Sequence, residues 1–282
     1  MNVQKKLAIG FIRAKLNLLS VISKRKAGAE AFKLFSTPMI KYNGRQAEIF
    51  KNAETLEFVT GQYLVKGFRC NHSQNKKVLL LHGFSSTCHK FDKYAIALIE
   101  KGYEVLAFDA PAHGNSSGET VNAVDYSDMI KKVNLLFGPI DAYIAHSFGG
   151  IAVSLALEEI PHNAETKVVL IAPATETTSA INGAFTMLGI HNNRAIRKSM
   201  DDMIFSLSGK ETAWFSIRRA IKNITASVLW VHDEDDLVTP LADALMVKED
   251  NLPNVQFLIT KGLGHQKIYR DDVVKNNIIN FL

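Results

Sequence analysis

The chain has 282 residues, of which 47% are hydrophobic and 22% charged, as is usual for a soluble globular protein with a large core. It contains no internal repeat, so a repeat array is excluded. The net charge of +5 comes from residues 1–45, which hold ten Lys or Arg and one acid, Glu30. The remainder therefore carries −4, which argues against a nucleic-acid enzyme, and we expect no nucleic-acid partner.

Compartment and membrane signals are weak. The two cysteines are too few for a disulfide framework and fit a reducing compartment. The apolar run at residues 7–22 contains Arg13 and Lys15, and it is shorter than the ~20 residues that a membrane-spanning helix needs. Its uninterrupted part, residues 7–12, is also short for the core of a signal peptide. We therefore expect a cytoplasmic protein.

The first element in chain order is a helix predicted from residue 5 to about residue 35. Its apolar side chains recur on one stripe, formed by Leu7, Phe11, Leu18 and Ile22. Such a helix could pack on its own domain, pair with a second copy in a homodimer, or contact a membrane surface. Packing is the favoured interpretation, and membrane contact is the weaker one. We treat residues 1–40 as a basic amphipathic arm.

After Pro38 the sequence alternates between strand-like and helix-like segments. Short runs rich in apolar and β-branched residues predict strands at 62–69, 77–81, 104–108, 142–145, 167–171, 227–231 and 255–260. Helical patterns fall at 91–101, 121–137, 149–159, 241–248 and 271–282. This alternation predicts an α/β domain over residues 41–282, with a mainly parallel, doubly wound sheet.

One stretch interrupts the alternation. About fifty residues, 173–225, separate two strands that a single helix could join, and a structureless loop of that length is uncommon. We predict a small helical cap at about 175–225, over the strand ends where open α/β sheets hold ligands. Apolar cap residues such as Phe185 and Trp214 could line a pocket, but packing of the cap itself is the preferred interpretation.

The clearest chemical signal is A-H-S-F-G-G at 145–150. It lies between a predicted strand and a predicted helix, which is the context of a G-x-S-x-G nucleophile elbow. Gly149 and Gly150 give the tight turn its room, whereas Ala145 is a mild departure from the pattern. The turn would raise the hydroxyl of Ser147 above the sheet, with His146 as a supporting neighbour. An ordinary glycine-rich turn is the alternative, and the context favours a nucleophile.

A serine nucleophile needs a base and an acid, which follow it in the order acid, then histidine, in this type of sheet. His265, in G-L-G-H after the last predicted strand, is the leading base, and a surface loop histidine is the alternative. The strand at 227–231 is followed by four carboxylates, Asp233, Glu234, Asp235 and Asp236. Composition does not choose among them, and Glu176 is a weaker candidate.

Two backbone amides are expected to form an oxyanion hole, those of Phe84 and Phe148. Phe84 follows His82 and Gly83 at the end of a long apolar strand, and both neighbours are expected to support the loop.

The loop at 109–116 is interpreted as structural, with Asp109 bonding loop amides and Gly114 allowing a bend. His113 and His89 are interpreted as loop histidines. No metal-ligand spacing or phosphate loop is present, so no cofactor or metal is expected.

These motifs together resemble the α/β-hydrolase superfamily. H-G-F at 82–84, D-A-P-A-H-G-N-S at 109–116, H-S-F-G-G at 146–150, V-H-D-E-D-D-L-V-T-P at 231–240 and G-L-G-H at 262–265 occur in the order of that family. The set is most similar to uncharacterised bacterial esterase-like members, including F-S-T-P at 35–38. In this superfamily the acid lies four residues before the proline of the penultimate loop, which implies Asp236.

The resemblance implies a serine hydrolase that cleaves a small ester or thioester through an acyl-enzyme, without a cofactor. A serine at the elbow argues against epoxide hydrolases and dehalogenases. Amidase, acyltransferase and C–C hydrolase activities stay open, because they use the same triad. A catalytically silent binding protein on the same fold is a rival interpretation, and the presence of candidates for all three triad residues favours the enzyme.

Overall fold

The computed structural model describes residues 3–38 and 46–282, which form two compact units. The first, the helical unit, combines Met1–Thr37 with Glu176–Phe215. The second, the α/β unit, combines Pro38–Thr175 with Ser216–Leu282. Residue 40, where the sequence places the end of the N-terminal arm, lies outside the described residues.

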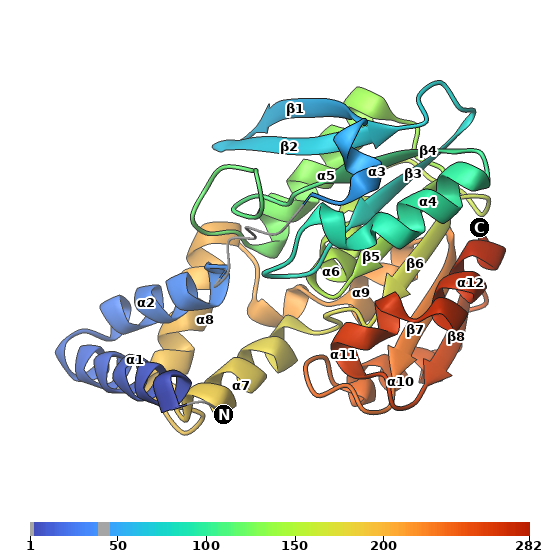
Figure 1. The fold of residues 1–282 in the computed structure, drawn as a ribbon. Coiled ribbons are helices and arrows are strands. Elements are labelled where there is room, and N and C mark those ends of the chain that lie inside the picture. Colours follow the sequence, from blue (N-terminus) through green and yellow to red (C-terminus); the bar gives the residue numbers. More distant parts are fainter. Residues whose placement is uncertain (1–2, 39–45) are drawn as a thin grey trace. The chain divides into compact units, whose positions relative to one another are not determined.

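Eight strands of the described chain form one sheet (Figure 1). They are β1 (Glu54–Thr60), β2 (Tyr63–Cys70), β3 (Lys76–Leu81), β4 (Tyr103–Phe108), β5 (Ala142–His146), β6 (Lys167–Ile171), β7 (Ser227–Asp233) and β8 (Val255–Thr260). Their order is β1-β2-β4-β3-β5-β6-β7-β8. Only the β1–β2 and β2–β4 pairs are antiparallel. The predicted α/β class with a mainly parallel sheet is confirmed, and all seven predicted strands are present.

The edge strand β1 was not predicted from the sequence. It pairs with β2 in a hairpin whose two-residue turn contains Gly61 at φ +54°. Only Phe58 of this strand is buried, because an edge strand has one neighbour and one covered face. The segment therefore lacks the continuous apolar run by which the central strands were recognised.

The α/β unit contains eight α-helices in its described part, and several begin at clear capping signals. They are α3 (Glu48–Lys51), α4 (Asp92–Glu100), α5 (Ala123–Phe137), α6 (Phe148–Leu157), α9 (Ile217–Ala220), α10 (Leu241–Glu249), α11 (Gly264–Lys267) and α12 (Asp272–Phe281). Short 3-10 turns occur at Cys88–Phe91, Ile221–Asn223 and Ile268–Arg270. At the start of α5, the side chains of Asn122 and Asp125 form a reciprocal capping box.

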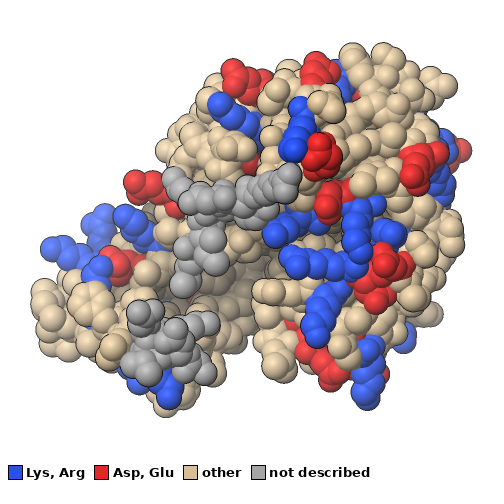
Figure 2. All heavy atoms as spheres, viewed as in Figure 1, with Lys and Arg blue, Asp and Glu red and all other residues tan. Residues whose placement is uncertain are grey.

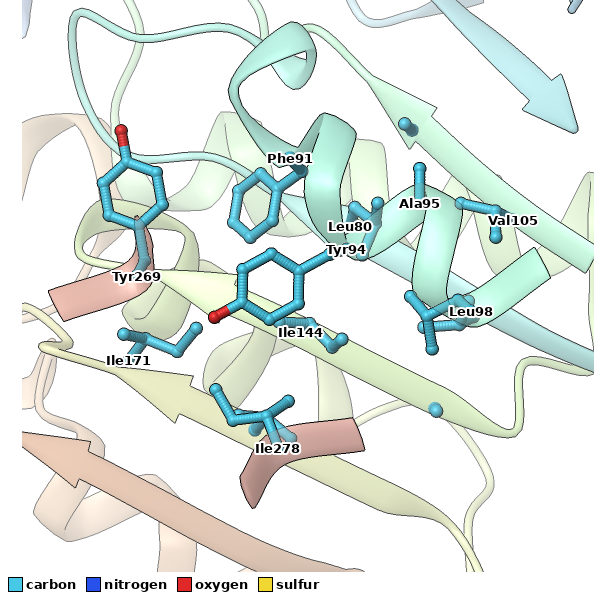
Figure 3. Close-up of a cluster of buried hydrophobic side chains, with 14 of the residues drawn as sticks. Leu80, Phe91, Tyr94, Ala95, Leu98, Val105, Ile144, Ile171, Tyr269 and Ile278 are labelled. Atoms are coloured by element: carbon cyan, nitrogen blue, oxygen red, sulfur yellow. The ribbon is translucent and has the colours of Figure 1, made fainter. Parts of the chain in front are cut away.

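A large apolar cluster fills one side of the sheet (Figure 3). Tyr94 and Leu98 of α4 lie among side chains from the sheet, such as Leu80 and Ile144, and Ile278 of α12 joins the same cluster. All five residues are at most 1% exposed. Such dense packing resists displacement of the strands, so the strand ends form a rigid base for the loops that follow them.

The helical unit contains α1 (Val3–Ile22), α2 (Lys24–Ser36), α7 (Thr177–Leu188), α8 (Arg194–Ser208) and a 3-10 turn at Thr212–Trp214. The single N-terminal helix predicted from the sequence is divided at Ser23. This residue has extended backbone angles, and its side chain accepts a hydrogen bond from the backbone N–H of Lys26 at 3.3 Å, capping α2. At Gly28, α2 passes so close to α8 that a Cβ would lie 2.5 Å from Ser199.

Candidate active site

Ser147 occupies a sharp turn between β5 and α6. Its φ of +53° lies in the left-handed region, which a residue with a side chain rarely adopts. Its backbone N–H donates to the carbonyl of Ile171 at 3.0 Å, and its own carbonyl accepts from Ala174 at 3.0 Å. The neighbouring strand β6 and its following loop therefore hold the turn in this strained form.

The small residues around Ser147 are required by close backbone contacts. A Cβ at Gly149 would lie 2.7 Å from the carbonyl oxygen of Leu81, and one at Gly150 would lie 2.6 Å from the Cβ of Pro173. Ala145 differs, because it is a fully buried residue of β5 whose methyl group the structure accommodates. The departure from glycine at this position therefore leaves the turn intact.

The three residues expected to form a triad lie within hydrogen-bond distance of one another. The Nε2 of His265 is 3.0 Å from the Oγ of Ser147, and its Nδ1 is 2.8 Å from the Oδ2 of Asp236. An ionised carboxylate can only accept hydrogen bonds, so Nδ1 carries the ring proton and Nε2 faces the serine as an acceptor. The elements that supply them are the β5–α6 turn, the loop after β7 and the start of α11.

Asp236 is buried and strongly hydrogen-bonded. Its Oδ1 accepts from the backbone N–H groups of Val238 at 2.7 Å and Thr239 at 2.9 Å, and its Oδ2 accepts from the Thr239 hydroxyl at 2.8 Å. Burial alone would raise the pKa of Asp236, but the hydrogen bonds from His265 and from these donors outweigh it and lower the pKa to about 2. The carboxylate is therefore ionised at neutral pH.

The other three carboxylates of this loop bond elsewhere. Asp233 accepts from the backbone N–H of Gly264 at 2.8 Å, and Asp235 accepts from that of Gly262 at 3.0 Å. Glu234 pairs with Lys261 at 3.0 Å. These contacts tie the loop after β7 to the loop that carries His265, which accounts for the crowding of acids that composition could not resolve. Glu176 lies in the helical unit, immediately before α7.

His146 supports the backbone of His265. Its Nε2 donates to the His265 carbonyl at 3.1 Å, and its ring lies 4.4 Å from the ring of Tyr269 and 4.8 Å from that of His265, measured between centroids. Burial, with a smaller contribution from the neighbouring His265, lowers the pKa of His146 to about 3. The ring is therefore neutral over the whole physiological range.

This burial makes stability depend on pH. An unfolded histidine has a pKa of about 6.5, so unfolding binds one proton at His146 between that pH and about 3. We expect its contribution to be complete above pH ~6.5 and to fall by about 1.4 kcal/mol for each pH unit below it. Urea unfolding at several pH values gives the slope of the unfolding free energy against pH. Below pH ~6.5 this slope should be shallower by that amount in His146→Gln than in the wild type. Equal slopes for variant and wild type would contradict the assignment.

The two residues expected to supply the oxyanion hole are neighbours. The rings of Phe84 and Phe148 have centroids 5.5 Å apart in an edge-to-face contact. Phe148 is the first residue of α6, so its N–H is one of the amides that have no partner within the helix. At Gly83, a Cβ would lie 3.1 Å from that of Ser147, so the chain leading to Phe84 runs directly against the elbow.

His82 holds the loop after β3. Its Nδ1 donates to the carbonyl of Gly83 at 2.8 Å, and its Nε2 accepts from the backbone N–H of Ala110 at 2.9 Å. Burial lowers the pKa of His82, so it is neutral. His113 acts similarly, since its Nε2 accepts from the N–H of Ser85 at 2.9 Å. Both rings therefore join the loop after β3 to the loop after β4.

Asp109 and Gly114 make the loop contacts expected of them. Asp109 accepts from the backbone N–H groups of Cys88 at 3.0 Å and Asn115 at 2.9 Å. Gly114 has φ +48°, and a Cβ there would overlap the Asp109 carboxylate. His89 is buried and packs against the rings of Phe50 and Phe68, so it does not lie at an open site.

Two residues near the acid were missed by the sequence analysis. The Thr239 hydroxyl lies 2.8 Å from Asp236 and 3.2 Å from Nδ1 of His265, so it orients both groups. His232 is fully buried, and its Nε2 donates to the carbonyl of Thr239 at 3.0 Å. The only sequence signal for Thr239 is its position directly before Pro240, three residues after the acid.

The structure describes residues 3–38 and 46–282, and this part of the chain has neither a metal-ligand cluster nor a membrane-spanning helix. In that part of the chain no group of three His, Cys, Asp or Glu side chains is placed to hold a metal ion. None of its helices combines the length and the apolar character needed to cross a bilayer.

Known proteins resemble this chain in part of its sequence and in its fold. The serine aminopeptidase family S33 matches residues 72–211. The 2-succinyl-6-hydroxy-2,4-cyclohexadiene-1-carboxylate synthase of Escherichia coli (strain K12) is 30% identical over 81 residues, which are 28% of this chain and 31% of that protein. The chain thus matches about a third of the length of this curated relative.

Solved structures share the fold over most of the chain. An esterase from Pyrococcus furiosus has a TM-score of 0.66 and 18% identity, covering 88% of this chain and 97% of its own. An α/β hydrolase from Penicillium sp. sh18 has a TM-score of 0.61 and 18% identity, covering 81% and 96%. At such identity the likeness shows the fold alone. With its strand order and these matches, the chain has the α/β-hydrolase fold.

Proposed function

We propose that the protein is a serine hydrolase that cleaves a small ester or thioester through a Ser147–His265–Asp236 triad. The observation that carries this proposal is the continuous hydrogen-bond chain from the carboxylate to the serine hydroxyl, at 2.8 and 3.0 Å. A hydroxyl with its base already in place is the arrangement that acyl transfer requires.

In this mechanism His265 takes the proton of Ser147 as the hydroxyl oxygen attacks the substrate carbonyl. Asp236 stabilises the imidazolium that forms and keeps the ring in the correct tautomer. The amides of Phe84 and Phe148, together with the N-terminal end of α6, stabilise the negative charge on the carbonyl oxygen. Water, activated by His265, then releases the acyl group and restores the serine.

An active-site probe tests the proposal directly. We expect a fluorophosphonate to label the folded protein on Ser147, as mapped by peptide mass spectrometry, because only an activated serine reacts readily. Labelling should be absent in Ser147→Ala. It should persist in Ser154→Ala, because the hydroxyl of Ser154 is buried within α6 and donates to the Gly150 carbonyl. Folded protein that takes no label would overturn the proposal and point to a silent scaffold.

A second candidate is transfer of the acyl group to an acceptor other than water, or cleavage of a C–C bond, on the same triad. The partial match to a synthase supports this second candidate. Denaturing mass spectrometry after brief exposure to a p-nitrophenyl ester would detect the acyl-enzyme. Its lifetime in water decides between the candidates, since a hydrolase releases the acyl group rapidly and an acyltransferase needs an added acceptor.

A further inference from the structure

The exposed face of α1 is an apolar surface that the proposed hydrolase chemistry does not use. Five large apolar side chains on this helix are between 63% and 86% exposed: Leu7, Phe11, Leu18, Val21 and Ile22. At 3.6 residues per turn they fall on one side of the helix. We call this set the apolar stripe. Isolated exposed apolar residues are ordinary, but five on one helical face form a continuous surface that marks an interaction site.

The apolar stripe is not needed to hold α1 in place. The opposite side of the helix buries Ile9 and Leu16, and α1 contacts α2, α7 and α8 within the helical unit. Arg13 adds a specific attachment, because its Nε donates to the carbonyl of Leu188 at 2.7 Å, at the C-terminal end of α7. The helix is therefore fixed by its other face, and the apolar stripe is presented outward.

The same segment is strongly cationic. Residues 3–29 contain seven Lys or Arg and no Asp or Glu. Lys15 pairs with Glu30 at 2.6 Å, but within the described chain no ion pair involves Lys6 or the run Lys24, Arg25 and Lys26. That run begins two residues after Ile22, the last residue of the apolar stripe, with Ser23 between them. Figure 2 shows basic side chains over α2 beside the uncharged surface of α1.

The apolar stripe and the positive charge beside it together indicate the chemistry of the partner. A symmetric pairing of two copies through α1 would bring together two segments, residues 3–29 of each copy, that contain seven Lys or Arg and no Asp or Glu. The repulsion between these cations opposes a dimer. An anionic bilayer surface matches both properties, since it offers an apolar layer beneath negative headgroups. Because α1 does not have the apolar character of a spanning helix, it would lie along the surface.

We propose that α1 docks the protein on the surface of an anionic lipid bilayer. The apolar stripe inserts at the boundary of headgroups and acyl chains, and Lys6, Lys24, Arg25 and Lys26 contact the headgroups. This docking does not depend on the reaction at Ser147, so it can be tested separately from the proposed hydrolase activity.

Vesicle sedimentation of the full chain tests the docking. We expect the protein to sediment with vesicles that contain about one third phosphatidylserine and to remain in solution with pure phosphatidylcholine vesicles. Raising the salt to about 0.3 M should weaken binding, because the charge contribution is screened. Phe11→Asp combined with Leu18→Asp should lower the vesicle affinity about tenfold or more, and neutralising Lys24, Arg25 and Lys26 to Gln should have a similar effect.

Leu135→Asp is the matched control, because Leu135 of α5 is 75% exposed and lies in the other unit. It should bind vesicles as the wild type does. All substituted side chains are exposed, so circular dichroism should show unchanged folding. The proposal would be overturned if the wild-type protein does not sediment with anionic vesicles. It would also be overturned if the stripe variant and the control lose vesicle binding to the same extent. A dimer that dissociates in the Phe11→Asp, Leu18→Asp variant would also overturn it, by identifying a second copy as the occupant.

Discussion

Asp236→Asn should lower kcat for ester hydrolysis about 10,000-fold while leaving the fold intact. The backbone amides of Val238 and Thr239 donate to Oδ1 of Asp236, so the asparagine oxygen must stay at that position. Its NH2 group then takes the place of Oδ2 and faces Nδ1 of His265. The imidazole must accept there, which moves its proton to Nε2 and removes the acceptor that Ser147 needs.

Asp235→Asn provides the matched control within the same loop. Asp235 is exposed, and its Oδ2 accepts the backbone N–H of Gly262 at 3.0 Å, which an amide oxygen can still do. We expect its kcat to stay within about threefold of the wild type, a change typical of a surface site. Thermal unfolding of both variants and the rate of fluorophosphonate labelling complete the comparison. If Asp235→Asn loses more activity than Asp236→Asn, the acid has been misassigned.

The central part of the fold could be predicted because its strands are buried on both faces and are therefore apolar along their whole length. Strands such as β5 and β6 are buried on both faces and read as short apolar runs. The edge strand β1 has one buried residue, Phe58, and gives no such signal. The break in the N-terminal helix could not be predicted, because the helical spacing of apolar residues continues through Ser23. At Ser23 the backbone is extended and the side chain caps α2, which separates the two helices.

The candidate site was predictable to a different extent at each residue. Ser147 stands out because the turn demands glycine at fixed positions around it. The acid does not stand out, since Asp233 and Asp236 have the same chemistry. Only the three-dimensional structure shows that Asp236 faces His265, whereas Asp233 accepts a hydrogen bond from the loop that carries His265. Thr239 was missed because a single hydroxyl carries no sequence pattern, although it contacts both the acid and the base.

Gly149→Ala should destabilise the protein by about 3 kcal/mol and sharply reduce labelling of Ser147. The new methyl group would lie 2.7 Å from the carbonyl oxygen of Leu81 and 3.0 Å from that of His82. Both are backbone atoms at the end of β3, so no side-chain rotation relieves the contact. The start of α6 must separate from the loop after β3, which also separates the amides of Phe84 and Phe148.

The same substitution at Gly183 should have the opposite effect on stability. Gly183 lies inside α7, and a Cβ there meets nothing within 4 Å. Gly183→Ala should therefore stabilise the fold by about 0.5–1 kcal/mol, because alanine loses less backbone entropy in a helix. Urea unfolding gives both values, and labelling should fall only in Gly149→Ala. Equal stability of the two variants would mean that the elbow can relax, and that the two oxyanion amides are not held by the contact between α6 and the end of β3.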